Sequence, residues 1–518
     1  MKAQRRGGIL SAMGWRHITA LWVVILLGAT VTARAGEAGG RHVVPVPPKG
    51  AAATAAESSE AIDRGTLEKM YQQELGSLWS PQIADRLYES HVLMEQYFAA
   101  KEASRRAEIV RQLEALKIDP NILGRIVRIR FYWPALTGGV YYINERVGPH
   151  AVMYFIGVPD GYDRTKSWPL VIKLPGAHAF ITTPPPSPDD VVRFYTTWIK
   201  DELKQHPDAV VLMPLLNLDE CWGPSYKGMN SVIQPLYHVA GRLNIDPRRV
   251  YLMGHGMSGH ATWNLALHYP TYFAAINPMS GGAPHVFQRV RMPGLRNIYC
   301  VVWHDSDDKI TPVQLSREMV KILRQYKYDV DYEETAVLGH APSDELLDRM
   351  YRKMRSRQRE LYPREVAHGS NRADTIFNRN DWVQVYQMLA SGPELKVRME
   401  RGTGILPVYQ NNYTITASIA SPNRIVARTQ NVESMRFYLN DQMVDMSRAV
   451  TVVVNNLARF EGMVRPSVEE MLKDQVFLGR GWRYFTAYVD VDFGASSGAA
   501  TRPATGPTTR KGTIEVIW

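Results

Sequence analysis

The stretch from Arg249 to Trp263 is the sequence feature that most constrains the fold. Its first part, Val250 to Met253, is a short apolar run of the kind that forms a buried strand. Small and turn-forming residues follow from Gly254 to Gly259, and a helical pattern begins at Thr262. Glycine adopts positive φ freely, so the three glycines in this segment permit a sharp turn. The stretch therefore predicts a strand, a tight turn and a helix.

Short apolar runs alternate with helical patterns on both sides of this stretch. The main predicted strands are 169–174, 209–214 and 297–303, and the main predicted helices are 190–204, 231–243 and 313–326. Buried strands that alternate with helices are typical of a parallel sheet that is covered on both faces. We therefore predict an α/β fold with a doubly wound parallel sheet.

The N-terminus has the pattern of a secretory signal. Basic residues precede an uncharged run from Ile18 to Val31, and Ala33-Arg34-Ala35 follows as a cleavage sequence. The run is shorter than the roughly 20 residues that a membrane-spanning helix needs. We therefore expect a signal peptide over 1–35, a secreted or periplasmic protein, and no stable membrane span after cleavage.

The length of 518 residues suggests two or three domains, and the pattern changes along the chain divide it further. Residues 36–60, rich in Ala, Gly, Pro and Ser, read as a flexible linker, and 61–137 as a helical N-terminal region. The strand and helix alternation occupies 138–360. Short strand patterns with turns over 361–518 predict a C-terminal all-β domain of sandwich type, with a disordered low-complexity insertion at 494–512.

The cysteines and the charge exclude several classes of protein. Cys300 lies in an apolar run and Cys221 in a loop-like segment, so two unpaired thiols are favoured, with a bridge between them as the alternative. The densest part of the net charge of +10, Arg349 to Arg359, predicts a solvated helix face, or else a site that binds an acidic polysaccharide or an anionic surface. Because no dinucleotide fingerprint, phosphate loop or zinc-type cysteine spacing occurs, we expect no cofactor, no metal and no nucleic-acid partner.

Six motifs between residues 138 and 360 together resemble one family. They are Val158 to Tyr162, Pro169 to Gly176, Val250 to Trp263, Ser280 to Gly282, His304 to Pro312, and Leu338 to His340. In this order they resemble the secreted bacterial α/β-hydrolases of the esterase and prolyl-oligopeptidase-like kind. The resemblance implies an α/β-hydrolase fold, a Gly-x-Ser-x-Gly turn that carries the nucleophile, and a Ser, Asp and His triad in chain order. It also implies a small-molecule, peptide or polysaccharide ester as substrate.

The position of the nucleophile depends on how this five-residue pattern is placed. In the first frame the pattern starts at Gly254, so Gly256 takes the nucleophile position and Ser258 stands where glycine is usual. In the second frame the pattern starts at Gly256, so Ser258 is the nucleophile and His260 fills a position that needs a minimal side chain. We favour the first frame, because it ends the strand at Gly254 and keeps the bulky imidazole out of the packing position.

The resemblance also assigns the remaining catalytic positions. It makes His340 the base, and it selects Asp308 as the acid because the family's acid lies four residues before the proline at Pro312. Asp305 and Asp307 are then turn residues. The oxyanion would be bound by backbone amides near Ala177 and at Met257.

Two functions from different classes follow. One is a serine-type hydrolase of ester or peptide bonds, in which Ser258 is the nearby nucleophile. The other is a catalytically inactive hydrolase homologue that binds a ligand, carbohydrate or partner through the same cleft. A metal site built on the His and Asp cluster is disfavoured, because His255, His304 and His340 stand where hydrolases without metal often carry histidine.

Overall fold

The computed structural model describes residues 61–133, 136–147, 150–176, 188–216, 226–373, 376–392, 394–398, 405–409 and 411–493. The expected signal peptide and linker over 1–60 lie outside the described residues. So do Cys221, the expected insertion at 494–512 and the final strand. The expectations for these segments stay predictions, as do the expected boundaries between regions.

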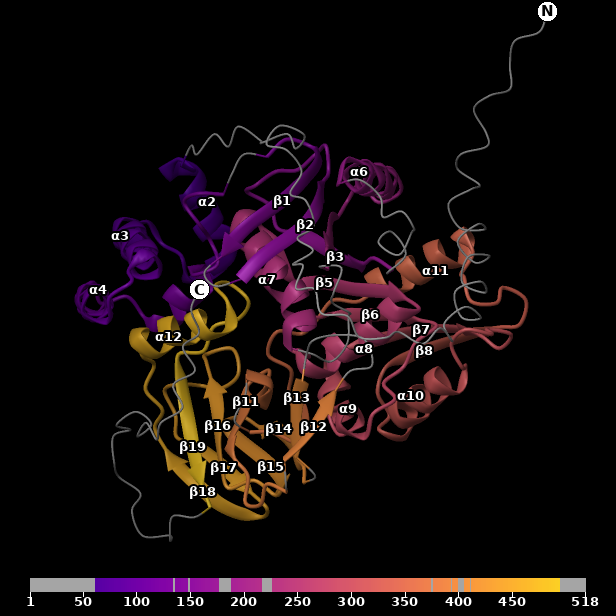
Figure 1. Cartoon of the computed structure of the whole chain (residues 1–518). Coiled ribbons are helices and arrows are strands. Elements are labelled where there is room, and N and C mark those ends of the chain that lie inside the picture. The colour runs from indigo at the N-terminus through magenta and orange to yellow at the C-terminus, as the bar shows by residue number, and fades with distance from the viewer. Residues whose placement is uncertain are drawn as a thin grey trace, which may run out of the picture.

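An eight-stranded sheet forms the centre of the chain, in the order β1-β2-β4-β3-β5-β6-β7-β8 (Figure 1). Strand β2 is antiparallel to both of its neighbours, whereas every pairing from β4 to β8 is parallel. The doubly wound parallel sheet predicted from the sequence is thus present from β4 to β8, whereas the antiparallel pairing of β1 and β2 was not predicted. Its strands are β1 Gly139–Val147, β2 His150–Val158, β3 Trp168–Leu174, β4 Val210–Pro214, β5 Ile245–His255, β6 Ala275–Met279, β7 Tyr299–Asp305 and β8 Val330–Thr335.

Helices cover both faces of this sheet because successive strand residues point to opposite faces. Val250 and Leu252 of β5 belong to one core with α7, α8 and α10, whereas Tyr251 and Met253 face a second core with α11. Helix α6 packs on the second face, beside β2 and β4. The helices of this region are α6 Pro188–Gln205, α7 Tyr226–Arg242, α8 Met257–His268, α9 Val286–Arg289, η3 Met292–Asn297, α10 Gln314–Gln325 and α11 Asp344–Arg355.

The N-terminal helices share their core with a helix from the other end of the chain. Val468, Met471 and Leu472 of α12 (Val468–Leu478) are buried in the same cluster as the apolar residues of the N-terminal region. In Figure 1 these helices lie at the left, with α12 directly below them. They are α2 Arg64–Leu75, η1 Gly76–Leu78, α3 Pro81–Ala99, α4 Ala103–Ala115 and α5 Pro120–Ile126.

The C-terminal region has the two facing sheets of a sandwich, but the expectation that it is all-β is wrong. It contains α12, which Ser467 caps by accepting a hydrogen bond from the Glu470 amide. One sheet has the order β18-β17-β15-β14-β9 and the other β10-β11-β16-β19, and a single apolar core lies between them. The elements are β9 Glu365–Ser370, η4 Ile376–Asn378, β10 Arg379–Asn380, β11 Val383–Gln387, β12 Glu394–Arg398, β13 Ile405–Tyr409, β14 Tyr413–Ser421, β15 Arg424–Gln430, β16 Ser434–Leu439, β17 Val450–Val454, β18 Leu457–Gly462 and β19 Ala487–Asp492.

A buried carboxylate joins the central sheet to the C-terminal region. Asp381 accepts a hydrogen bond of 2.6 Å from Arg359 and lies 3.1 Å from a guanidinium nitrogen of Arg483. Both arginines also donate to backbone carbonyls, Arg359 to Phe273 and Arg483 to Thr271. These contacts fix the site-bearing sheet against the sandwich.

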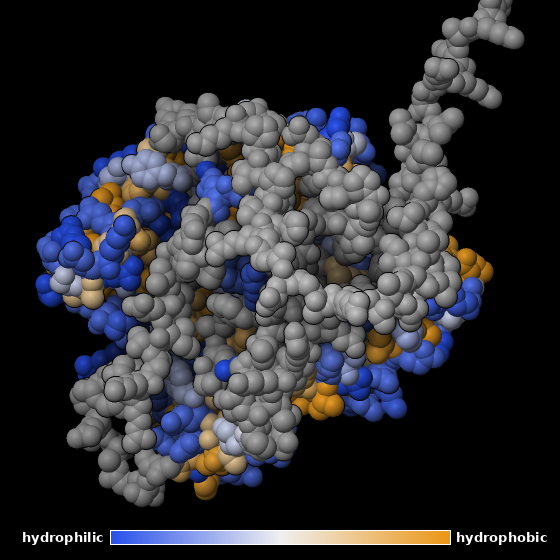
Figure 2. All heavy atoms as spheres, in the orientation of Figure 1, coloured by the Kyte–Doolittle hydropathy of each residue, from blue (hydrophilic) through white to orange (hydrophobic). Residues whose placement is uncertain are grey.

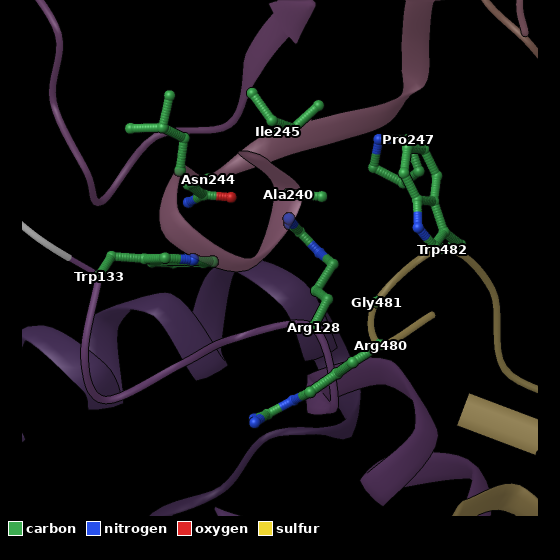
Figure 3. A pocket seen from close by; sticks show the side chains of 10 residues that line it. Arg128, Trp133, Ala240, Asn244, Ile245, Pro247, Arg480, Gly481 and Trp482 are labelled. Carbon is green, nitrogen blue, oxygen red and sulfur yellow. The ribbon is translucent and has the colours of Figure 1, made fainter. Parts of the chain in front are cut away.

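A small cavity of about 20 Å³ lies where the N-terminal helices, α7 and the segment after α12 meet (Figure 3). The indole nitrogen of Trp133, which lines it, is buried and finds no hydrogen-bond partner among the described residues. This volume suffices for about one ordered water. We therefore regard the cavity as part of the packing at this junction.

Hydrophilic and hydrophobic side chains are mixed on the face of the molecule that Figure 2 shows. In the described part of the view in Figure 2, hydrophilic side chains dominate over α2, α3 and α4, with hydrophobic residues scattered among them. The basic run on and after α11 is ion-paired, which favours the solvated helix face over an anion-binding surface; its pairs are Arg349–Glu333, Arg352–Asp348, Lys353–Asp331, Arg355–Asp208 and Arg357–Asp329. Within the described ranges, no helix combines the length and apolar character needed to cross a membrane.

Cys300 is a buried, unpaired thiol in β7. Burial raises the pKa of this thiol well above its ordinary value. It is therefore a core side chain, as expected, and not a nucleophile.

Candidate active site

The turn between β5 and α8 lies at the carboxyl edge of the central sheet. Strand β5 ends at His255, one residue beyond the expected Gly254, and α8 begins at Met257. Gly256 is the single residue between them, with φ 62° and ψ −120°. Residues other than glycine rarely adopt these backbone angles without strain.

Two further glycines explain why the strand and the helix approach so closely. A Cβ atom on Gly254 would lie 2.4 Å from the carbonyl oxygen of Ser258, and one on Gly259 would lie 2.2 Å from that of Met279. Glycine thus occupies the positions at which the backbones of β5, α8 and β6 come closest, and this arrangement places the tip of the turn at Gly256.

Ser258 lies in the first turn of α8, and its hydroxyl points away from the turn tip. The side chain is fully buried, and Oγ donates a hydrogen bond of 2.6 Å to the carbonyl of Pro175, at the end of β3. Its backbone carbonyl accepts a bond from Thr262 Oγ1. The hydroxyl is thus engaged in packing α8 against the segment after β3.

His340 faces the turn tip from the loop after β8. A Cβ atom built on Gly256 would lie 2.9 Å from His340 Nε2, and, apart from the two chain neighbours of Gly256, no other described residue has atoms within 4 Å of that point. The other ring nitrogen, Nδ1, lies 2.8 Å from Asp308 Oδ2. Because a carboxylate only accepts, Nδ1 donates this bond, and Nε2 is the ring nitrogen that faces Gly256.

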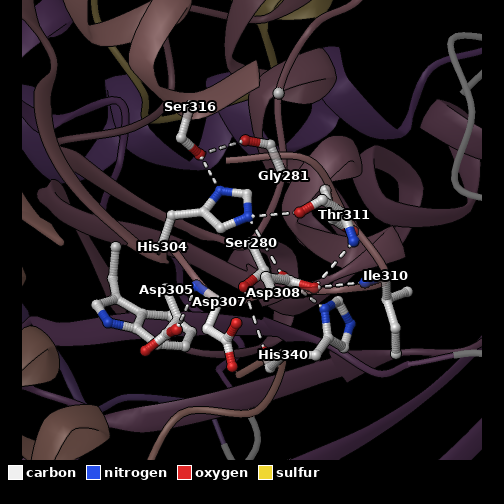
Figure 4. A network of polar contacts seen from close by, with 12 residues as sticks. Ser280, Gly281, His304, Asp305, Asp307, Asp308, Ile310, Thr311, Ser316 and His340 are labelled. Atoms are coloured by element: carbon white, nitrogen blue, oxygen red, sulfur yellow. Dashed lines mark hydrogen bonds and ion pairs between the residues drawn. The ribbon is translucent and has the colours of Figure 1, made fainter. Parts of the chain in front are cut away.

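Asp308 is fully buried in the loop after β7 and accepts hydrogen bonds from several groups (Figure 4). Oδ1 accepts from the amides of Ile310 and Thr311 at 2.8 and 2.9 Å. Burial by itself would raise the pKa of the Asp308 carboxyl, but the hydrogen bonds from His304, His340 and the Thr311 amide outweigh it. They hold this pKa well below its usual range. The carboxyl is therefore ionised under all physiological conditions.

A second histidine touches the same carboxylate. His304 is completely buried at the end of β7, and its Nε2 lies 3.3 Å from Asp308 Oδ2. Its ring also contacts the Thr311 carbonyl through Nε2 at 3.0 Å and Ser316 Oγ through Nδ1 at 2.7 Å. Asp308 thus lies between two imidazoles, one facing the turn tip and one facing the core.

Three side chains hold the segment that carries His340. Asp305 Oδ2 accepts from the Leu338 amide at 2.8 Å and from Thr335 Oγ1 at 2.6 Å, which ties the end of β7 to the loop after β8. His255 Nε2 donates to the carbonyl of His340 at 2.6 Å, and Ser280 Oγ donates to the same carbonyl at 3.3 Å. Asp305 is therefore more than a turn residue, because it anchors the loop on which His340 stands.

The oxyanion positions are described only in part. The amide of Met257 is the first of α8, and the first-turn amides of a helix lack partners within the helix. Ala177 and the loops 177–187 and 217–225 lie outside the described residues. Among the residues with described positions, no three His, Cys, Asp or Glu side chains gather as a group that could hold a metal ion.

No family model and no curated protein matches this chain. Hydrolases are among the solved structures that resemble part of this chain. One is a thermostable esterase, 23% identical over 43% of this chain and 63% of that chain, with a TM-score of 0.35. This chain thus covers less than two thirds of that esterase.

Two further solved structures show similar values. A fluorophosphonate-binding serine hydrolase from Staphylococcus aureus is 12% identical over 42% of this chain and 99% of its own, with a TM-score of 0.34. A ferulic acid esterase from Anaeromyces mucronatus is 13% identical over 42% of this chain and 89% of its own, with a TM-score of 0.31.

The sequence singled out Gly256, Met257, Ser258, Asp308 and His340. The structure brings Gly256, Asp308 and His340 together, and it turns the hydroxyl of Ser258 elsewhere. The contact of His304 with Asp308 was not expected. The only sequence signal for it is the spacing, because His304 lies near the end of β7 and Asp308 follows four residues later in the next loop.

Proposed function

We propose that this chain is a hydrolase-fold protein that binds an ester- or amide-bearing ligand beside His340 and does not use a serine nucleophile. In this proposal Gly256 occupies the nucleophile position, His340 the base position and Asp308 the acid position. The observation that carries it is the distance of 2.9 Å between His340 Nε2 and the Cβ position of Gly256. The hydroxyl of Ser258, which donates to Pro175, supports it further.

The rate acceleration expected of a site without a nucleophile favours ligand binding over catalysis as its function. Removal of the catalytic serine from a serine protease lowers kcat by about 2 × 10⁶, and the remaining acceleration over water is roughly 10³ to 10⁴. Enzymes typically accelerate their reactions by about 10⁶ or more. A site with His340 and Asp308 but no nucleophile therefore falls short of ordinary catalysis by a factor of about a hundred or more.

Slow hydrolysis by water is the second candidate, and the contact of 2.8 Å between His340 and Asp308 favours it. In this step His340 Nε2 takes a proton from water while the water oxygen attacks the ester carbonyl carbon. The carbonyl oxygen accepts a hydrogen bond from the Met257 amide, and the proton then passes to the leaving alkoxide. General-base assistance of this kind contributes roughly 10² to 10⁴ in rate.

Labelling with a fluorophosphonate probe tests the proposal, because the probe reacts only with an activated serine. We expect no labelling of the wild type or of Ser258→Ala, and hydrolysis of p-nitrophenyl acetate no more than roughly 10⁴ above the buffer rate. The variant Gly256→Ser is the positive control. Wild-type labelling that disappears in Ser258→Ala would instead make Ser258 the nucleophile.

Export is part of the proposal and rests on the pattern of residues 1–35. N-terminal sequencing of the protein recovered from the culture medium or periplasm checks it. A start at Gly36 is the expected result, since cleavage is predicted after Ala35.

A further inference from the structure

We infer that the outer edge of β19 is a docking surface, and that residues 513–518 of this chain pair with it as a further strand of the C-terminal sandwich. These residues lie outside the described ranges, and their sequence alternates as that of a half-buried strand does. The inference is independent of the chemistry at His340. It rests on the edge that β19 presents, on the apolar side chains beside that edge, and on the pattern of the segment.

The described part of the sandwich has four edge strands, which are β9, β18, β10 and β19. Strand β10 has only two residues. In β9 the carbonyl of Glu365 accepts a hydrogen bond from Asn297 of η3, which covers this edge. In β18, Arg459 is an extra residue in the pairing with β17, and such a bulge disrupts further pairing. Strand β19 differs, because it pairs with β16 over six residues without a register shift.

Backbone amides of β19 face its outer edge. The Phe493 amide donates to the carbonyl of Glu433, and alternate amides of an antiparallel strand face the same neighbour. The amides of Tyr488 and Asp490 therefore face away from β16, and none of the described strands lies on that side. An edge of this kind readily accepts another strand.

Apolar side chains beside this edge are only partly covered. The guanidinium of Arg459 lies over the ring of Phe493, 4.9 Å from its centroid, which places β18 and β19 on the same side of the sandwich (Figure 1). Phe460 and Phe493 are partly buried against the sandwich core. Leu457 and Met463, at the two ends of β18, are 57% and 53% exposed. An apolar cover along β19 would extend the core toward these side chains.

The segment has an apolar face that can supply this cover. The core-facing residues of β19 are Ala487, Val489 and Val491. In the segment, one face would carry Ile514, Val516 and Trp518, and the other Thr513, Glu515 and Ile517. Side chains on the same face of paired strands become neighbours. The first set therefore continues the row of core residues in β19, and Glu515 faces the solvent.

The length of chain between β19 and the segment permits this docking. An antiparallel partner requires residues 494–512 to cross only the spacing between two strands, about 5 Å. A connection of this length can extend to about 60 Å, and the entropic cost of closing a loop grows slowly with its length.

A second copy of the chain is the competing occupant of the edge. Two β19 strands paired with each other would bring the outward carboxylates of both copies, Asp490 and Asp492, onto one joined sheet. Like charges on neighbouring strands oppose pairing. The segment instead brings a single carboxylate, Glu515, to the edge.

Hydrogen exchange of the full chain, measured by mass spectrometry at residue resolution, tests the inference. We expect the amides of Tyr488 and Asp490 to be protected in the wild type. In a variant that ends at Gly512 they should exchange at least about tenfold faster, because two ladder hydrogen bonds of ordinary strength are lost. Analytical ultracentrifugation at the same protein concentrations should show a monomer.

Two neighbouring substitutions distinguish the faces of the segment. Val516→Asp places a charge on the face that packs on the core and should expose the β19 amides as the truncation does. Ile517→Asp is the matched control, because it introduces the same side chain one residue away, on the opposite face. It should leave the protection unchanged.

Four results would overturn the inference. In the wild type, the amides of Tyr488 and Asp490 could exchange as fast as unprotected amides, or their protection could fall on dilution together with a dimer, which would assign the edge to a second copy. Protection that survives the removal of residues 513–518 would exclude the segment as the occupant. Equal effects of Val516→Asp and Ile517→Asp would contradict the pairing of faces. The two wild-type results stand even if a variant fails to fold.

Discussion

Gly256→Ser should convert this site into a working serine esterase. The new Oγ would stand beside His340 Nε2, with Asp308 and the Met257 amide already in position. Steric crowding limits the gain in esterase activity, because the Cβ position lies 2.9 Å from Nε2 and ordinary van der Waals contact begins at 3.4 Å. The ring must therefore retreat by 3.4 − 2.9, or about 0.5 Å, against its bond to Asp308.

The magnitude follows from two opposing effects. A serine nucleophile is worth about 2 × 10⁶ in kcat, and a misplacement of about 1 Å costs roughly 10². We therefore expect kcat to rise roughly 10⁴-fold over the wild type. The strained backbone at φ 62° lowers the stability of the variant by about 1–3 kcal/mol.

The assay is hydrolysis of p-nitrophenyl acetate, with a burst of p-nitrophenol as the sign of an acyl-enzyme. The double variant Gly256→Ser with Ser258→Gly tests whether the helix also needs glycine at its first turn. His340→Ala in the Gly256→Ser background is the control and should return to the wild-type rate. An active wild type whose rate Gly256→Ser leaves unchanged would refute the argument, because Gly256 would then not be the nucleophile position.

Three further predictions concern stability. Ser258→Ala removes the bond to Pro175 and should cost about 1 kcal/mol in thermal unfolding, with no change in esterase rate. Asp381→Ala leaves Arg359 and Arg483 buried without their carboxylate and should cost about 3–5 kcal/mol in urea unfolding, whereas a loss below about 1 kcal/mol would contradict this account. Burial lowers the pKa of His368 from 6.5 to about 3, so between these pH values the unfolded state binds more protons. The free energy of unfolding should fall by about 1.4 kcal/mol per pH unit as the pH drops from 6.5 toward 3. His368→Gln should flatten this slope, and an unchanged slope would assign it to other groups.

The pattern of strands and helices in the central region could be predicted from the sequence because it is local. Apolar runs bounded by turn residues specify buried strands, and the helix expected over 313–326 is observed at Gln314–Gln325. Helix α12 was missed because its residues lie among strand patterns and its apolar partners come from the other end of the chain. Its existence depends on tertiary packing more than on its own periodicity.

The partners in the candidate site were also predictable in part. Asp308 follows β7 and His340 follows β8, and these strands are parallel neighbours, so both side chains emerge at one edge of the sheet. Their contact of 2.8 Å is the one that the resemblance to α/β-hydrolases implied. The anchoring role of Asp305 was not predictable, because its partners, Thr335 and Leu338, become neighbours only when β7 and β8 pair.

The sequence by itself determined where the turn tip lies, since glycine at 254, 256 and 259 leaves one backbone path between β5 and α8. Only the tertiary structure decided where the nearby polar groups point. The hydroxyl of Ser258 goes to Pro175 because β3 ends beside α8, and His304 meets Asp308 because the loop after β7 folds back over its own strand. Backbone conformation is set by each residue and its neighbours, whereas the direction of a hydrogen bond depends on atoms that the chain brings together from far apart.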